Sequence, residues 1–289
     1  MTSKLISKIY RDNVRDLGKS IFVVGSARSG TTWLANLIAS QFKSRIMFEP
    51  FNPILVQEYK DFNYFQYMRP DDKNEALFDY CQKIFSGNIR NAWIDREVRH
   101  LFPDRRIIKC IRASLMLKWI DIQFPEVPKF FIVRHPCAVV LSRMRLVWAT
   151  DDDIRYFLDQ PKLMADFLDD HMEAIKNART DEEKHAIIWA ITNLVPIKQF
   201  QTELNIFRYE SLVENPEEEI TRLFEILRIP YRSSVLEELR QPSSTVSNKS
   251  AIWNGKNIND QWKKELTPKQ IHRILNIVDI FGLSTLLEL

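Results

Sequence analysis

The stretch IFVVGSARSGTTWL, residues 21–34, constrains the fold of this chain more than any other. Four apolar β-formers come first, then a polar turn bounded by Gly25 and Gly30, and then an apolar run. The chain has only six glycines, so two of them in one turn indicate a backbone that bends tightly or approaches a ligand closely. This order predicts a buried strand, a phosphate-binding loop and a helix.

The loop GSARSGTT spaces its glycines as in the nucleotide triphosphate loop G-x-x-x-x-G-K-[ST], but Thr31 stands in place of the lysine. Backbone N–H groups at the helix start and the helix dipole still favour an anion there. Arg28 is the cation within the loop, and its guanidinium can hold two oxygens of one tetrahedral group. We therefore expect a site for phosphate or a similar group. The alternative is an ordinary strand-to-helix turn capped by threonine.

Strand and helix patterns alternate along the chain. Strands are expected at residues 21–25, 45–50, 106–111, 129–136 and 205–210, and helical segments at 31–41, 74–86, 114–122, 137–148, 152–178, 181–203, 217–228 and from Thr267 onward. This predicts an α/β fold, in which helices flank a central, mostly parallel sheet with the ligand at the carboxyl ends of the strands. We expect one domain over residues 1–289, with 1–19 as an N-terminal extension and 241–263 as a flexible loop that closes over the ligand.

Composition limits the classes of function. A formal net charge of +3 is too small to indicate a nucleic-acid partner, though it suits a polyanionic small ligand. No apolar run reaches the roughly 18–20 residues that span a bilayer, and the polar N-terminus lacks the apolar region of a signal peptide. We therefore expect no membrane span and a cytoplasmic location. The three cysteines share no metal-ligand spacing and are expected to be reduced.

The strand KFFIVRHP argues against magnesium-dependent phosphate chemistry. Magnesium-dependent NTPases need an acid at the end of a later apolar strand, where this chain has Arg134. A cation at that place predicts a second anionic group on the ligand and a reaction that needs no metal.

Two motifs resemble those of the sulfotransferases that use 3′-phosphoadenosine 5′-phosphosulfate (PAPS). The first, RSGTTW at residues 28–33, is similar to the family's 5′-phosphosulfate loop, with Ala27 in place of the family's proline. The second, formed by Arg134, Pro136 and Ser142, matches the family's 3′-phosphate motif Arg-x-Pro-(x)5-Ser. The resemblance covers residues 20–270 and implies the family's fold and donor.

Two further segments are similar but match less closely. Residues 208–216, RYESLVENP, are similar to the family's Y-E-D-L…N-P segment, whose tyrosine, here Tyr209, lies near the adenine. The family's C-terminal loop R-K-G-x-x-G-D-W-K is only loosely matched by residues 255–263. The residue that makes the second contact to the 3′-phosphate is therefore not fixed, and Lys249 and Lys256 are the candidates. We include Lys256 in the expected donor site.

The resemblance implies roles for the motif residues. Arg134 and Ser142 would hold the 3′-phosphate, and Trp33 and Tyr209 would lie against the adenine. The 5′-phosphosulfate would be held by Arg28, Ser29, Gly30, Thr31 and Thr32. From the residues alone, Arg134 could instead pair with a carboxylate. Ser142, Trp33 and Tyr209 could likewise be ordinary buried side chains without a ligand.

Catalysis of sulfuryl transfer requires cations near the leaving group. Arg28 and Lys109, at the end of the third expected strand, are the candidates. Lys109 could equally be a solvated surface lysine.

A base must also take the proton of the acceptor hydroxyl. Cytosolic family members carry a histidine in a K-T-H segment, which here reads KCIR, whereas other branches use a glutamate downstream of the loop, where Glu49 lies in FEPF. Burial beside apolar neighbours is expected to raise the pKa of Glu49 toward that of a useful base. The alternatives are a structural ion pair between Glu49 and Arg45, or His135 as base, although His135 lies inside the 3′-phosphate motif.

The sequence therefore predicts a metal-free sulfotransferase that moves a sulfuryl group from PAPS to an acceptor hydroxyl and releases adenosine 3′,5′-bisphosphate (PAP). The missing histidine favours a saccharide or another small-metabolite acceptor, and no oligomeric state is specified. Aromatic residues are candidates for its pocket, or for packing onto the sheet: Tyr59, Phe62, Tyr64, Phe65 and Tyr67. Two other functions stay open: a P-loop kinase-like enzyme, and an inactive nucleotide-binding protein of the same fold.

Overall fold

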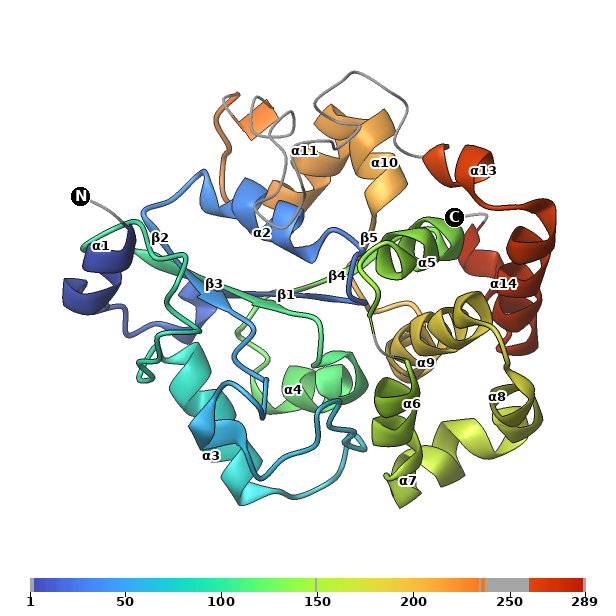
Figure 1. Cartoon of the computed structure of the whole chain (residues 1–289). Helices are drawn as coiled ribbons and strands as arrows, with labels where there is room; N and C mark the ends of the chain where they lie inside the picture. The colour runs from blue at the N-terminus through green and yellow to red at the C-terminus, as the bar shows by residue number, and fades with distance from the viewer. Residues whose placement is uncertain (1–2, 149, 234, 237–259, 288–289) are drawn as a thin grey trace.

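Five strands form one parallel sheet in the order β2-β3-β1-β4-β5 (Figure 1). The computed structural model describes residues 3–148, 150–233, 235–236 and 260–287. The strands are β1 (Ser20–Gly25), β2 (Ser44–Phe48), β3 (Arg105–Cys110), β4 (Lys129–Val133) and β5 (Ile206–Arg208). The predicted α/β class is confirmed. β5 is shorter than expected because Tyr209 already begins the next helix.

β1 lies at the centre of the sheet, and its side chains point alternately into two cores. Ile21 and Val23 pack against α2 and α11, whereas Phe22 and Val24 face the core that includes α3, α4 and α9. These helices are α2 (Thr31–Ala39), α11 (Pro216–Ile226), α3 (Glu75–Phe85), α4 (Leu117–Gln123) and α9 (Asp181–Phe200). Figure 1 shows α2 and α11 on one face of the sheet and α3 and α4 on the other. Burial on both faces explains why β1 reads as an unbroken apolar run.

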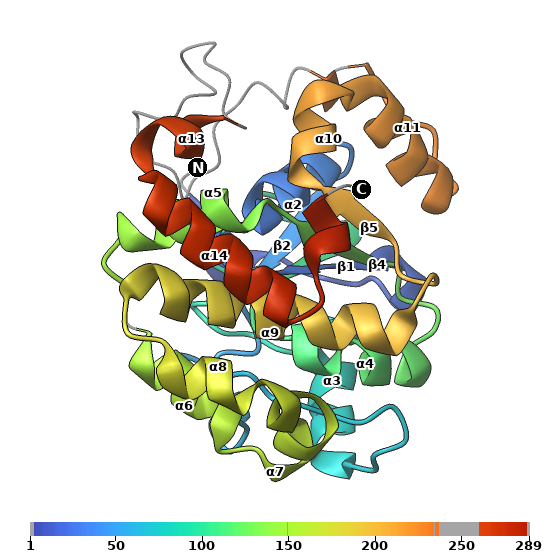
Figure 2. The ribbon, with the colours of Figure 1, turned by 90° about the vertical axis from the view of Figure 1, so that its right-hand side faces the viewer.

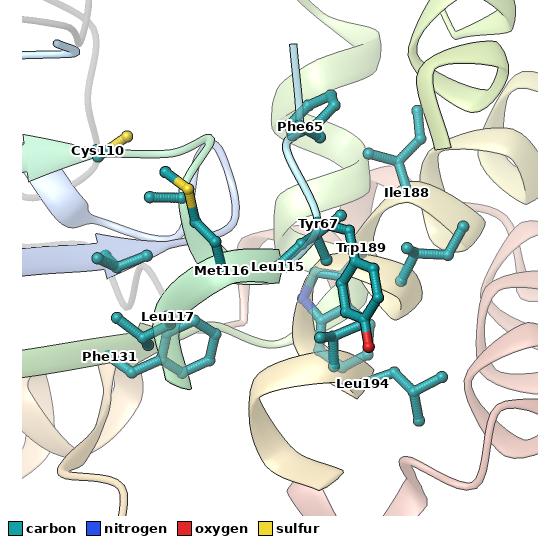
Figure 3. Packing of buried hydrophobic residues seen from close by; sticks show 14 of the residues in the cluster. Phe65, Tyr67, Cys110, Leu115, Met116, Leu117, Phe131, Ile188, Trp189 and Leu194 are labelled. Carbon is teal, nitrogen blue, oxygen red and sulfur yellow. The ribbon is translucent and has the colours of Figure 1, made fainter. Parts of the chain in front are cut away.

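The buried helix α9 supports the second face of the sheet and the site above it. Figure 3 shows part of this core, where Leu115, Met116 and Leu117 meet Ile188, Trp189 and Leu194 of α9. The Trp189 indole is fully buried and donates a hydrogen bond to the carbonyl oxygen of Arg134 at 3.0 Å. Figure 2 shows α14 (Pro268–Ile280) lying along α9, and both pack against α5 (Pro136–Met144).

The remaining helices are short. They are α1 (Ser3–Ile9), η1 (Leu17–Lys19), η2 (Gln57–Tyr59), η3 (Ser114–Met116), α6 (Asp151–Leu158), α7 (Pro161–Leu163), η4 (Met164–Leu168), η5 (Asp169–His171), α8 (Met172–Asn177), α10 (Tyr209–Glu214), α13 (Gln261–Glu265) and η6 (Ser284–Leu287). The segment 152–178 is broken into pieces rather than forming one long helix, since Pro161 cannot donate an amide to the preceding turn. Within the described part of the chain, no helix is both long and apolar enough to cross a bilayer.

Most of the expected ligand-closing loop, residues 241–263, lies outside the described residues. Its last residues are helical rather than loop, because α13 begins at Gln261.

The N-terminal extension is fastened to the sheet by a buried carboxylate. Asp12 accepts hydrogen bonds from Nε and Nη2 of Arg106, both at 2.7 Å, and from Nη1 of Arg45 at 3.1 Å. The side chains of all three residues are at most 2% exposed. Because a buried charge without its partner is costly, this one carboxylate fixes the extension against β2 and β3.

Replacing Asp12 with asparagine is expected to lower the free energy of unfolding by about 3–5 kcal/mol, because two buried guanidinium groups lose their shared carboxylate. Urea denaturation measures this difference. Asp61→Asn, at an exposed position, is the matched control and should change stability by less than about 0.5 kcal/mol. Equal effects of the two substitutions would contradict the anchoring role of Asp12.

Candidate active site

The carboxyl ends of the strands converge on one cavity of about 360 Å³. The chain segments that follow the five strands supply its walls, as expected for a parallel sheet. The lining residues are Ala27, Arg28, Gly30, Thr31, Thr32, Trp33, Phe48, Glu49, Trp93, Arg96, Lys109, Ile111, Arg112, Arg134, Leu146, Trp148 and Tyr209. Most of the predicted site residues therefore share this cavity. Ser29 and Ser142 are not part of the lining, and Lys249 and Lys256 lie outside the described residues.

The loop between β1 and α2 needs both of its glycines. A Cβ atom on Gly25 would lie 2.4 Å from the carbonyl oxygen of Ile132 on the neighbouring strand. Gly30 is the N-cap of α2 with a φ of 99°, and a Cβ there would lie 2.6 Å from the ring of Tyr209. The loop backbone is thus packed tightly against its neighbours, and the N-terminus of α2 opens into the cavity.

The structure joins the two predicted phosphate motifs. Arg28 Nε donates to Ser142 Oγ at 2.9 Å, and Arg134 Nη1 donates to the carbonyl oxygen of Arg28 at 3.3 Å. Burial and the nearby Arg134 charge lower the pKa of Arg28. Within the described residues Arg134 forms no ion pair, and its Nε is buried without a partner, so it does not have the carboxylate partner that was the alternative. Two like charges held together favour binding of an anion between them.

Two more buried polar atoms lack partners at the same place. These atoms, Ser29 Oγ and Trp33 Nε1, have no hydrogen bond within the described residues. Such groups are rare in folded proteins and are expected where a ligand completes the bonding. The rings of Trp33 and Tyr209 lie with their centroids 5.2 Å apart, and the Arg134 guanidinium lies over Tyr209 at 4.2 Å. Both rings contribute to the cavity wall as well as to the core.

Glu49 lies on the opposite wall in a buried ion cluster. Its Oε1 accepts from Lys109 Nζ at 2.5 Å, and its Oε2 accepts from Arg112 Nη1 at 2.9 Å and from the amide of Ile111 at 3.1 Å. Burial alone would raise the pKa of Glu49, but Lys109 and Arg112 outweigh it and hold the pKa below its ordinary value. The expectation of a raised pKa is therefore wrong for the protein without ligand.

The partners of Glu49 also settle two alternatives. Arg45 does not pair with Glu49, since it is bound to Asp12 and Asp95. Lys109 is only 5% exposed, which rules out a solvated surface lysine.

His135 has a structural environment. Its Nδ1 accepts from the amide of Cys137 at 3.2 Å and so caps α5, while its ring stacks on Trp262 at 4.3 Å. Burial and nearby cations lower the pKa of His135 to about 4, so its ring is neutral at physiological pH. His135 does not line the cavity.

Sequence reasoning missed several residues of the site. Arg112 follows the end of β3, and the placement argument used for Lys109 could have found it. No sequence pattern points to Arg143. Its Nε donates a hydrogen bond to the carbonyl oxygen of Ala27 at 3.4 Å, and its Nη2 donates one to Ser26 Oγ at 3.2 Å, so it supports the loop. Burial lowers the pKa of Arg143 to about 10. Trp93 and Arg96 enter the cavity from a segment without any motif.

The aromatic residues 59–67 do not line the cavity. Tyr59, Phe65 and Tyr67 are buried in the core, so packing explains them. Tyr64 accepts a hydrogen bond from Arg112 and thereby supports the cluster around Glu49 from behind.

Replacing Glu49 with glutamine should lower the free energy of unfolding at pH 7 by about 3–5 kcal/mol, because Lys109 and Arg112 would be left buried without a counter-charge. Since the pKa of Glu49 is depressed in the folded state, its stabilising effect is complete above the ordinary value of 4.5 and disappears as pH falls through the folded-state pKa. The stability difference between wild type and variant should therefore shrink in acid. Urea denaturation at pH 7 and pH 3.5 measures it, with the exposed Glu58→Gln as control. A difference that is the same at both pH values would refute the ion cluster.

A family model described as "Sulfotransferase family" matches residues 20–233. An uncharacterized protein of Aquifex aeolicus (strain VF5) is 23% identical over 235 residues, which cover 80% of this chain and 28% of that protein. Nodulation protein NoeE of Sinorhizobium fredii (strain NBRC 101917 / NGR234) is 23% identical over 305 residues, which cover 93% of this chain and 65% of NoeE. The chain thus spans less than two thirds of the length of both relatives.

Among solved structures, the sulfotransferase domain from the curacin biosynthetic pathway aligns with a TM-score of 0.47 and 16% identity, over 91% of this chain and 96% of that domain. The family match includes the loop with Arg28, the strand end with Arg134 and both partners of the Glu49–Lys109 pair. Because it covers most of the chain, this protein belongs to the sulfotransferase family.

Proposed function

We propose that the protein transfers a sulfuryl group from PAPS to an acceptor hydroxyl. The observation that carries this proposal is the single cavity that holds Arg28 and Arg134 on one side and the Glu49–Lys109 pair on the other. A donor with phosphate groups at two positions of its nucleoside needs two sets of cations, and a hydroxyl acceptor needs a base beside the transferred group.

The residues present fit such a donor. Arg134 and Ser142 would hold the 3′-phosphate, and Lys256 is proposed to add a further cation. Trp33 and Tyr209 would contact the adenine, and the loop residues 28–32 would hold the 5′-phosphosulfate with the amides at the start of α2. The unpartnered Ser29 Oγ, Trp33 Nε1 and Arg134 Nε support this fit, because a polyanionic nucleotide supplies the acceptors that these donors lack.

The donor supplies a sulfuryl group on a phosphate leaving group, and the chain positions and stabilises charge. Arg28 would neutralise the charge that develops on the leaving phosphate, a contribution of roughly 3 kcal/mol by analogy with oxyanion-hole donors. Lys109 would attract the oxygens of the transferred group.

Glu49 would take the proton of the acceptor hydroxyl. Lys109 and Arg112 hold it as a carboxylate, and in this pairing it is a weak base. If Lys109 turns toward the anionic donor, Glu49 loses its closest counter-charge and its pKa rises. We propose that donor binding activates the base in this way, so that water or acceptor is not deprotonated before the donor is in place.

Arg134→Gln is expected to weaken PAP binding by about 1.5–3 kcal/mol, or about 10- to 150-fold, because a charge-assisted hydrogen bond to phosphate is lost. Calorimetric titration measures the affinity, and the exposed Arg155→Gln serves as the control with the same charge change. The wild type should also bind PAP more tightly than ATP with magnesium. Tighter binding of ATP with magnesium would favour the kinase-like alternative.

Glu49→Gln is expected to lower the rate of sulfuryl transfer about 10²- to 10⁴-fold while PAP binds at least as tightly as in the wild type, since the base acts on the acceptor and its loss removes a negative charge from the cavity. Transfer is followed with sulfur-labelled PAPS and a broad library of hydroxyl acceptors, at a temperature where PAP binding shows the variant to be folded. Full activity of the variant would exclude Glu49 as the base. A wild type that labels no acceptor would instead favour a nucleotide-binding protein without activity.

A further inference from the structure

A second, larger cavity adjoins the first. It encloses about 960 Å³ between the N-terminal extension and the segment 90–96. Its lining residues are Ser7, Lys8, Ile9, Tyr10, Arg11, Arg90, Asn91, Ala92, Asp95 and Arg96. Arg96 lines both cavities, so the two are neighbours. The two cavities are therefore close enough that parts of one acceptor could occupy both.

The charge of this second cavity is strongly positive. Lys8, Arg11 and Arg90 form no ion pair within the described residues. Asp95 is the only acid in the lining, and its carboxylate is bound by the buried Arg45 at 2.9 Å. That pair is neutral, and Arg96 has Glu97 at 3.9 Å. The net positive field therefore comes from Lys8, Arg11 and Arg90 and favours anionic ligands.

Two of the arginines are held in place before any ligand binds. The Arg90 guanidinium lies 3.6 Å from the ring centroid of Tyr10, and its Nη2 donates to Tyr10 O at 2.6 Å. Arg96 lies between two rings, 3.4 Å from the centroid of Phe48 and 4.1 Å from that of Trp93. Phe48 directly precedes Glu49. Pre-organised guanidinium groups lose less freedom on binding and suit carboxylate, phosphate or sulfate groups.

We propose that the second cavity binds an acidic group of the acceptor, so that the acceptor is an extended anionic oligosaccharide whose reacting hydroxyl lies at Glu49. The acidic group, a carboxylate or a sulfate ester, would lie beyond Arg96 and contact Arg90 and Arg11. This rests on the proposed sulfotransferase function and specifies its acceptor. The volume of about 960 Å³ lies at the upper end of the range for small-molecule sites, so it has room for more than one small substituent. The extension anchored by Asp12 would thus form part of the acceptor site.

The test is direct binding of defined tetrasaccharides to the full chain saturated with PAP, which occupies the donor part of the first cavity. Tetragalacturonate and sulfated maltotetraose are the anionic probes, and maltotetraose is the neutral match. The double variant Arg11→Gln/Arg90→Gln removes two charges from the cavity. Arg15→Gln/Lys19→Gln removes two exposed charges from the same extension and is the matched control.

At least one anionic probe should bind more than tenfold more tightly than maltotetraose, and the cavity variant should lose about tenfold of that affinity while the control loses less than twofold. Added salt should weaken anionic binding. Whichever anionic probe binds more tightly shows whether the second cavity prefers a carboxylate or a sulfate ester. Equal binding of all three probes, or equal loss in the two variants, overturns the proposal. PAP affinity is measured in the same titrations. If PAP does not bind, the donor assignment is wrong. If PAP binds but the anionic probes bind no better than maltotetraose, only the proposed class of acceptor is wrong.

Discussion

The parallel pairing of β1 with β3 and β4 is the constraint on which the rest of this molecule depends. In a parallel sheet all carboxyl ends meet at one edge, so loops far apart in sequence become neighbours there. Gly25 ends the central strand, Lys109 precedes the last residue of its neighbour on one side, and Arg134 follows the strand on the other. A change of strand order would disperse these groups over unrelated surfaces.

Gathering cations at one edge has an energetic cost that the fold offsets only in part. Glu49 neutralises Lys109 and Arg112 and is itself kept ionised by them. Around Arg28 and Arg134 the charges are partly desolvated and repel one another. The stability of this edge and its affinity for anions are thus linked, because a polyanionic ligand relieves the repulsion that the folded protein tolerates.

Three of the five non-glycine residues that have a positive φ in the described part of the chain lie in or beside the cavity lining, and the other two, Gln201 and Arg228, lie outside it. Arg28 has a φ of 73°, Glu49 a φ of 47° and Val147 a φ of 51°, values that side chains other than glycine rarely adopt. Val147 lies between Leu146 and Trp148, which both line the cavity. Such conformations persist only where surrounding packing enforces them, and two of these residues, Arg28 and Glu49, line the cavity themselves.

The sequence by itself determined the α/β class, the loop with its two glycines and the positions of Arg28, Glu49, Lys109 and Arg134 at strand ends, because these follow from local patterns and from the geometry of a parallel sheet. It did not determine the protonation of Glu49: the pKa depends on the balance between burial and the distance to Arg112, and only the folded chain sets both. Other features also come from segments that carry no motif. These are the part of the cavity wall formed by Trp93 and Arg96, the hydrogen bonds from Arg143 to the loop, and the second cavity. Their roles arise from tertiary contacts, since a side chain acquires its function from the charges and surfaces that the fold places beside it.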